Sequence, residues 1–341
     1  MNQMEIKSSK RNVQQHFVTA SYLAGFTPDG SRDSQLYVYE RNTEQMFRAV
    51  PDRVAKRRNY YSVPKYDGGI DDQVDVRLTA LEGQAMPVLR KLLAGNYDLS
   101  MFERALLAYL IAFQEFRTPW ARTNFQKLEL ATKEQLVRAS AKVPGYMERI
   151  LKELEAKGEL DGSVSADEIR DAVKSRRIKL VAKPHAGIDA MVSTSQAIGN
   201  VYTQMVWAVL RSKGKEFLTS DTPVVRRNRA FKGGFYGGGL MSSGAQVWFP
   251  LSKSACLVIR HDVEKMKKFD ELLEAGKAKE AETLRDELPP IRGHEVQDAL
   301  VDAVNLQTIL NADRFVYSPY ESADVPKLFK GESQNIRISF S

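Results

Sequence analysis

The sequence predicts an α+β fold, a helix-rich single domain around a small, mostly antiparallel sheet, with charged helical arms. Helical spacing of apolar residues recurs over long stretches such as 71–93 and 102–116. Short runs rich in aromatic and β-branched residues are instead scattered from residue 36 to residue 338. Because some of these runs pair through short hairpins and the rest lie far apart in the chain, we expect mostly antiparallel pairing.

The composition indicates a globular protein. Of the 341 residues, 43% are hydrophobic and 27% are charged, which is ordinary for a packed domain. The apolar run Ala105 to Gln114 is about half of what a membrane-spanning helix needs. The first residues lack the apolar core of a secretory signal, and the single cysteine, Cys256, suits a reducing compartment. These features predict a cytoplasmic protein with no membrane partner.

The elements are predicted from caps, breakers and periodicity. We expect a disordered tail at 1–12 and one elaborated domain over 13–341, with charged helical insertions near 121–175 and 262–290. Capping-box patterns, Ser100 with Glu103 and Ser165 with Glu168, mark two helix starts. The remaining expected elements are a short helix in 13–26, hairpins at 36–50 and 245–259, helices at 188–210 and 295–310, a helical pair at 262–288, and strands at 315–317 and 336–338.

The stretch Phe217 to Val224 reads as a short apolar strand that runs into a Ser-Asp-Thr-Pro turn. Pro223 fixes its own φ and keeps Thr222 extended, so the strand ends at about Asp221. A carboxylate held at a strand end is a common arrangement in active sites. The alternative is that Asp221 caps the turn by accepting backbone N–H groups.

Three windows concentrate the basic charge. The net charge of +7 is unevenly distributed, with cations gathered in 52–66, 174–183 and 204–232. Arg57, Arg58 and Tyr60 place cations beside aromatic rings, which is what binding to single-stranded nucleic acid requires. Arg226, Arg227 and Arg229 form a second basic group ahead of a glycine-rich stretch. The alternatives are that the cations are solvated and that the tyrosines dock their loop on the core.

Two further positions carry candidate chemistry. Arg117 ends a predominantly apolar helix, where a charged group must be paired or open to a cleft. It is a candidate anion-binding residue or one half of a structural ion pair. His16 stands near the start of the first predicted helix and is either a general base beside a pocket or a core or capping residue.

Taken together, several short motifs resemble a mostly bacterial family known as domain of unknown function 4238. The matching stretches are His16-Phe17-Val18, Tyr22-Leu23, Phe26, Leu36 to Arg41, Asn59-Tyr60-Tyr61, Glu82, Arg117-Thr118-Pro119, Phe217 to Val224, Phe249 to Ser252, and Asn305. The resemblance implies one shared site made by His16, Arg41, Glu82, Arg117, Asp221 and Asn305. It implies no reaction. Members usually have proline where this chain has Thr19, so we expect a different backbone there.

These residues lead to a nucleic-acid-directed hydrolase, a nuclease or another phosphoester-cleaving effector, as the first hypothesis. In it His16, Asp221, Glu82 and Arg117 are catalytic. Arg41 and Asn305 bind substrate together with Arg57, Arg58, Tyr60, Arg226, Arg227 and Arg229. Asp221 and Glu82 are candidate ligands for a divalent metal such as Mg²⁺, although the four histidines show no metal-ligand spacing.

Two alternatives stay open beside the hydrolase. One is a non-catalytic module that binds RNA or DNA through the basic windows. The other is a module whose charged helical arms contact a protein partner or a second copy of the chain. The glycine-rich stretch after Arg229 fits neither a Walker loop nor a dinucleotide fingerprint.

Overall fold

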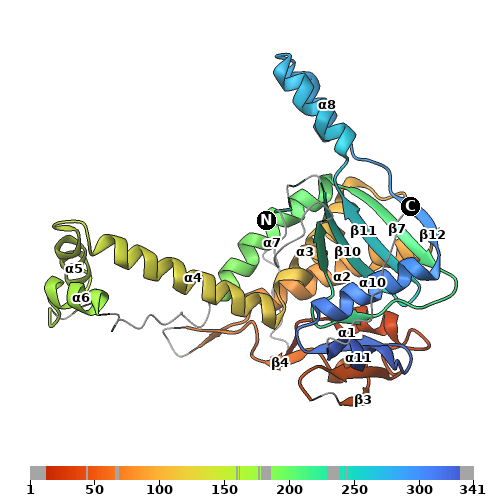
Figure 1. Ribbon diagram of the computed structural model, residues 1–341, viewed down its shortest axis with the longest axis horizontal. Coiled ribbons are helices and arrows are strands. Elements are labelled where there is room, and N and C mark those ends of the chain that lie inside the picture. The colour runs from red at the N-terminus through yellow and green to blue at the C-terminus, as the bar shows by residue number, and fades with distance from the viewer. Residues whose placement is uncertain are drawn as a thin grey trace, which may run out of the picture. The chain divides into compact units, whose positions relative to one another are not determined.

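The computed structural model describes residues 13–330 apart from 44, 66–68, 159, 161, 176, 178–185, 229–238, 241 and 243. The predicted tail at 1–12 and the predicted strand at 336–338 lie outside these residues. The chain is α+β, as predicted (Figure 1). It forms two compact units, one made of Met1–Trp120 with Val192–Ser341 and the other of Ala121–Met191. Within the described residues, none of the helices combines the length and apolar character needed to cross a bilayer.

A five-stranded sheet forms the centre of the first unit, and its strand order is β12-β7-β11-β10-β9. Its strands are β7 (Val206–Ser212), β9 (Val225–Asn228), β10 (Ala245–Ser252), β11 (Ala255–Arg260) and β12 (Arg292–Val296). All neighbours pair antiparallel except β12 with β7. The predicted hairpin at 245–259 is confirmed, whereas β12 lies where the sequence predicted the start of a helix.

Helices cover both faces of this sheet (Figure 1). On one face α10 (Asp298–Asn311) packs Val301 and Val304 against Trp248 and Cys256. On the other face lie α2 (Gln73–Leu93) and α3 (Met101–Phe116). The capping box that the sequence predicted at the start of α3 is present. It satisfies backbone donors that the first turn of a helix leaves unpaired.

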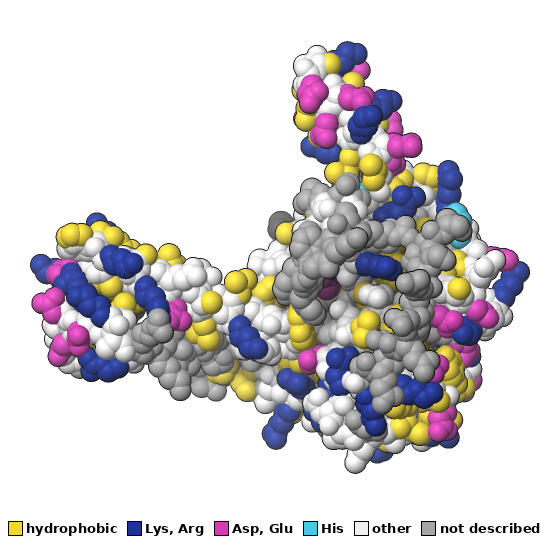
Figure 2. All heavy atoms as spheres, in the orientation of Figure 1, with side chains coloured by type: hydrophobic (Ala, Val, Ile, Leu, Met, Phe, Trp, Pro, Cys, Tyr) yellow, Lys and Arg dark blue, Asp and Glu magenta, His cyan; other side chains and the backbone are white. Residues whose placement is uncertain are grey.

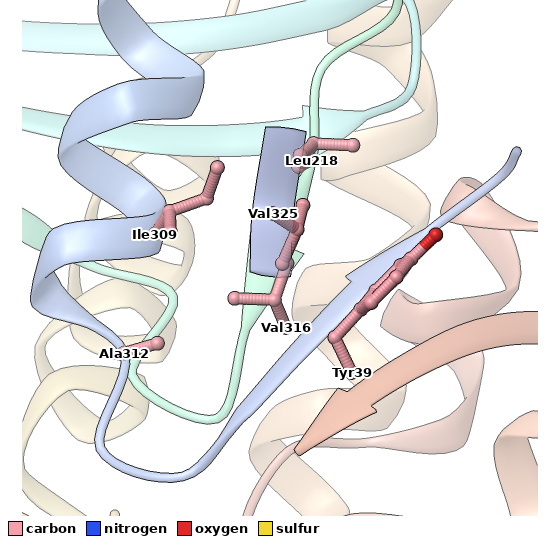
Figure 3. Packing of buried hydrophobic residues seen from close by; sticks show 6 residues of the cluster. All are labelled: Tyr39, Leu218, Ile309, Ala312, Val316 and Val325. Carbon is pink, nitrogen blue, oxygen red and sulfur yellow. The ribbon is translucent and has the colours of Figure 1, made fainter. Parts of the chain in front are cut away.

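A four-stranded antiparallel sheet has the order β3-β2-β13-β8. Its strands are β2 (Leu36–Glu40), β3 (Met46–Ala49), β8 (Thr219–Ser220) and β13 (Phe315–Ser318). Figure 3 shows the apolar cluster that packs this sheet against α10 and α11 (Asp324–Phe329). Its members are Tyr39, Leu218, Ile309, Ala312, Val316 and Val325. The cluster therefore joins segments nearly 300 residues apart in sequence.

The N-terminal region differs from its prediction. Residues 13–26 were predicted as one short helix, but Gln14–His16 form strand β1, which pairs antiparallel with β4 (Lys56–Arg58). The helix α1 (Ala20–Leu23) begins only after Thr19, whose hydroxyl accepts a hydrogen bond from the Tyr22 N–H. A 3₁₀ turn follows at Ala24–Phe26. The other short ladder joins β5 (Val63–Pro64) to β6 (Ile70–Asp71), and a 3₁₀ turn spans Pro51–Arg53.

The predicted helix at 188–210 is wrong in its last quarter. Helix α7 spans Ala186–Gln204, and the chain then enters β7. Arg104 is buried and donates to the carbonyl oxygens of Thr203 and Met205, while the Trp207 indole donates to that of Tyr202. Side chains thus satisfy the carbonyl groups at the helix end, which lets the chain leave the helix without a glycine or proline.

Helices dominate the second unit. Its elements include α4 (Pro119–Ser140), which starts at the boundary, α5 (Tyr146–Ala156) and α6 (Ala166–Lys174). Arg170 of α6 pairs with Glu148 of α5, and Met147 and Leu151 are buried. In the first unit, α8 (Val263–Glu274) and α9 (Ala278–Asp286) form the predicted helical pair. Acidic and basic side chains are interspersed along α8 (Figure 2).

Candidate functional site

A polar pocket of about 180 Å³ opens within the first unit. Strand β1, helix α1, the first half of α2 and the end of α3 all contribute to it. Its lining residues are His16, Thr19, Ala20, Ser21, Arg32, Tyr61, Asp75, Leu78, Thr79, Glu82 and Arg117. Three of the six residues that the family resemblance placed in one site therefore do share it, and we call His16, Glu82 and Arg117, together with Asp75, the pocket group.

Arg117 is the buried cation of the pocket, which the exposed Arg32 also lines. It stands at the C-cap of α3 and is only 1% exposed. Its Nη1 pairs with Glu82 of α2, and its Nε and Nη2 both donate to the Gln114 side-chain oxygen. The Gln114 amide in turn donates to the Phe17 carbonyl at 2.9 Å. A guanidinium has five N–H donors and these contacts use three of them, so Arg117 keeps donor capacity at the pocket.

His16 presents a buried and unpaired ring nitrogen. Its Nε2 has no hydrogen-bond partner among the described residues. Burial, helped by Lys56, lowers the pKa of His16 below its ordinary value of 6.5. The imidazole is therefore neutral at pH 7. A neutral imidazole with a free nitrogen can accept a proton from a bound molecule.

Asp75, in the first turn of α2, also lines this pocket and was missed by the sequence reasoning. Its side chain hydrogen bonds with that of Gln15, and burial raises the pKa of the carboxyl, with Asp72 and Glu82 adding to the rise. Within the described residues, no salt bridge neutralises it. The signal that could have found it is the spacing of Asp75 and Glu82, since seven residues are about two helical turns and put both on one face.

Exposed cations lie beside the pocket strand. In the β1–β4 ladder, His16 lies opposite Lys56, and Gln15 and Gln14 lie opposite Arg57 and Arg58, which are both exposed. The Arg57 guanidinium also lies 6.0 Å from the Phe17 ring centroid, and the substrate-binding role of both arginines stays a prediction.

Tyr60 does not fit the predicted stacking role. It is 6% exposed, and its ring packs against Phe17 at 5.9 Å and Tyr61 at 4.9 Å between ring centroids. The tyrosine docks its loop on the core, the alternative that the sequence had left open.

Asp221 lies outside the pocket and has a structural role. It is 3% exposed, its Oδ1 accepts the N–H of Asp313 at 3.0 Å, and its Oδ2 accepts those of Arg314 at 2.8 Å and Phe315 at 3.1 Å. Burial raises the pKa of Asp221 to about 7, while the amide donors act in the opposite direction. Figure 3 shows the bend after Ala312 that leads into β13 beside the segment following Leu218. The prediction that Asp221 is the catalytic hub is corrected, because its oxygens hold this bend.

Asn305 and Arg41 also hold backbone groups. Asn305, 8% exposed on α10, accepts the Leu218 N–H at 2.8 Å and donates to the Glu216 carbonyl at 2.9 Å. Arg41 donates to the Ile309 carbonyl at 2.6 Å at the end of α10 and stacks over the Phe329 ring. Their predicted role in substrate binding is therefore corrected. Asp221, Asn305 and Arg41 form the framework group, which ties α10 and β13 to neighbouring strands.

The second predicted basic group is already engaged where it is described. Arg226 pairs with Glu115, which also accepts the Tyr202 hydroxyl at 2.6 Å. The Arg227 guanidinium lies 5.3 Å from the Trp248 ring centroid. Arg229 lies outside the described residues. Arg226 therefore already has an acidic partner within the chain, whereas Arg57 and Arg58 have no ion pair among the described residues.

The predicted metal ligands do not meet. The oxygens of Asp221 accept backbone N–H groups beside β13, whereas Glu82 pairs with Arg117 in the pocket. In the described part of the chain, no cluster of three or more His, Cys, Asp or Glu side chains has the arrangement to hold a metal ion. The assignment of Asp221 and Glu82 as a shared metal site is corrected for this reason.

The fold and the pocket together define an α+β protein whose polar pocket combines a neutral histidine, a buried arginine and two carboxyl groups. The chain belongs to the family described as "Protein of unknown function (DUF4238)", whose model matches residues 14–322. The predicted family resemblance is therefore confirmed. No curated protein and no solved structure matches the chain.

Proposed function

We propose that this chain is a nucleic-acid-directed enzyme that cleaves phosphoester bonds in the pocket around His16. The observation that carries the proposal is that His16 lines the same pocket as Arg117 and has a buried Nε2 without a hydrogen-bond partner among the described residues. Leaving a buried polar atom unpaired costs free energy, and although Arg41 Nε and the Tyr317 hydroxyl are also unpaired among the described residues, neither of those residues lines the pocket. A cytoplasmic location belongs to the proposal and is supported by the single cysteine.

Each role follows from the chemistry of the group. His16 accepts a proton from the attacking hydroxyl or water, because its imidazole is neutral at pH 7. Arg117 donates to the phosphoryl oxygens, where charge develops in the transition state. Glu82 and Gln114 hold the guanidinium in one orientation through the contacts described above. Glu82 is therefore a positioning residue for Arg117.

The strand β4 supports a polyanionic substrate. Arg57 and Arg58 are exposed on the strand that pairs with the strand of His16, so a phosphate backbone bound there would pass close to the pocket. The cations alone would also serve a binding module without catalysis. That alternative leaves the unpaired His16 nitrogen without a purpose, which is why the enzyme is preferred.

The test uses the purified full chain with end-labelled single-stranded RNA and DNA, and measures cleavage and binding separately. His16→Gln should slow cleavage about 100- to 10,000-fold while binding persists, and the matched variant His294→Gln, in an exposed strand, should cleave normally. Binding without cleavage by the unaltered chain would favour the non-catalytic module. Neither binding nor cleavage would favour a protein-interaction role.

A further inference from the structure

Two carboxyl groups line the pocket in contrasting surroundings. Asp75 and Glu82 both project from α2 into it. Glu82 is ion-paired with Arg117. Asp75 has no cationic partner among the described residues and is half-buried, and burial raises its pKa. A half-buried carboxyl group without a cationic partner holds its proton more readily than an ordinary one, so Asp75 can serve as a proton donor.

We propose that the pocket cleaves RNA rather than DNA, with the 2′-hydroxyl of the substrate as nucleophile, His16 as its base and Asp75 as the proton donor to the leaving group. The inference rests on the proposed function and adds to it a substrate class and a further catalytic residue. Both proton-transferring groups line one pocket with Arg117, which would donate to the phosphate of a bound substrate.

The step balances without any further reactant. The 2′-oxygen forms a bond to the adjacent phosphorus while the bond from phosphorus to the 5′-oxygen breaks. The 2′-hydroxyl proton passes to Nε2 of His16, and the carboxyl proton of Asp75 passes to the departing 5′-oxygen. The products are a 2′,3′-cyclic phosphate and a free 5′-hydroxyl. Proton exchange with water then returns His16 to its neutral form and Asp75 to its protonated form.

The pocket suits an internal nucleophile. A 2′-hydroxyl is already next to its phosphorus, so the reaction gains the advantage of an intramolecular attack and needs only a base and an acid. The pocket volume of about 180 Å³ is below the roughly 300–1,000 Å³ of a drug-sized ligand site, so it would hold one sugar and its phosphate. The neighbouring nucleotides would lie outside, over Arg57 and Arg58 of β4.

The first experiment compares two oligonucleotides of one sequence, one all-ribose and one all-deoxyribose, with the unaltered full chain. We expect cleavage of the RNA alone, with a 2′,3′-cyclic phosphate on the upstream fragment. Equal cleavage of the DNA, or RNA products with a linear phosphate from the start of the reaction, would overturn this inference while leaving the proposed function intact. Failure to cleave either strand would overturn both.

The second experiment tests Asp75 as the proton donor. Asp75→Asn should slow RNA cleavage about 100- to 10,000-fold. The loss should largely disappear on RNA in which sulfur replaces the 5′-bridging oxygen, because a thiolate leaves without a proton. His16→Gln should not be rescued by that substrate.

Asp98→Asn, at an exposed position away from the pocket, is the matched control. An equal loss on both substrates for Asp75→Asn would contradict the assignment, and Asp75→Glu, which keeps a carboxyl, should retain more activity than Asp75→Asn.

Discussion

The pocket group and the framework group look alike in the sequence, since both consist of polar side chains within or beside largely apolar elements. They differ in what their hydrogen-bonding atoms contact. Asp221 and Asn305 use theirs on backbone groups of neighbouring segments. In the pocket group, His16 keeps a nitrogen unpaired within the described residues and Arg117 keeps unused donors. Arg41 Nε in the framework group is also unpaired, but Arg41 does not line the pocket, so unused hydrogen-bonding capacity indicates a candidate site only where the residue lines a cavity.

The largest effect on stability is expected from Asp221→Ala. The change leaves the N–H groups of residues 313–315 without their acceptor, and at about 1–3 kcal/mol for each buried unpaired group, less some relaxation, the free energy of unfolding should fall by about 3–5 kcal/mol. Denaturant unfolding measures the loss. The control is Asp313→Ala at a neighbouring exposed position, which should change the free energy of unfolding by less than about 0.5 kcal/mol. If Asp221→Ala unfolded like the unaltered chain but stopped all cleavage, Asp221 would belong to the active site and not to the framework group.

His16→Gln should give the opposite pattern, with cleavage reduced about 100- to 10,000-fold and the unfolding midpoint nearly unchanged. The unaltered chain should also lose activity at acidic pH, because protonation removes the base. The loss should begin below pH 6.5, since burial, Lys56, Arg117 and Arg32 lower the pKa of His16 more than Asp52 raises it. Initial rates between pH 4.5 and 8 test this. If His16→Gln still lost activity at acidic pH, a group other than His16 would be responsible for the pH dependence.

A smaller loss of stability is expected from Asn305→Ala, about 2 kcal/mol, because one buried N–H and one carbonyl lose their partner. The rate of cleavage per folded molecule should not change. Thermal unfolding and single-turnover kinetics measured on one sample separate these effects. A change in rate without a change in unfolding would move Asn305 from the framework group to the site.

The smallest effect is expected on the salt dependence of nucleic-acid binding. Changing both Arg57 and Arg58 to alanine should reduce the slope of log affinity against log salt by about 1–2, since each arginine contacts at most one phosphate. Lys268→Ala on α8 provides an exposed cation elsewhere and should leave the slope unchanged. Arg226→Ala should also leave it unchanged, because Glu115 already pairs with that guanidinium. An unchanged slope for the β4 variant would place the nucleic acid on another surface.

Local patterns were sufficient where the interaction itself is local. The capping boxes of α3 and α6 and the hairpins β2–β3 and β10–β11 are present as predicted. The prediction of secondary structure failed where a side chain far away in the sequence determines where a helix ends. The apolar spacing of 205–210 continues that of α7, yet Arg104, a hundred residues earlier, binds the carbonyl groups at the helix end and the chain becomes β7. Strand β1 exists because β4 pairs with it.

The candidate site shows the same division. The sequence by itself determined the α+β class, the residue types that carry chemistry and the family, because periodicity, caps and short motifs are properties of neighbouring residues. Only the tertiary structure decided that His16, Asp75, Glu82 and Arg117 share a pocket while Asp221 binds backbone amides. The physical reason is that burial and hydrogen-bond partners depend on which distant segments pack together, and a side chain's role follows from the atoms left unpaired after that packing.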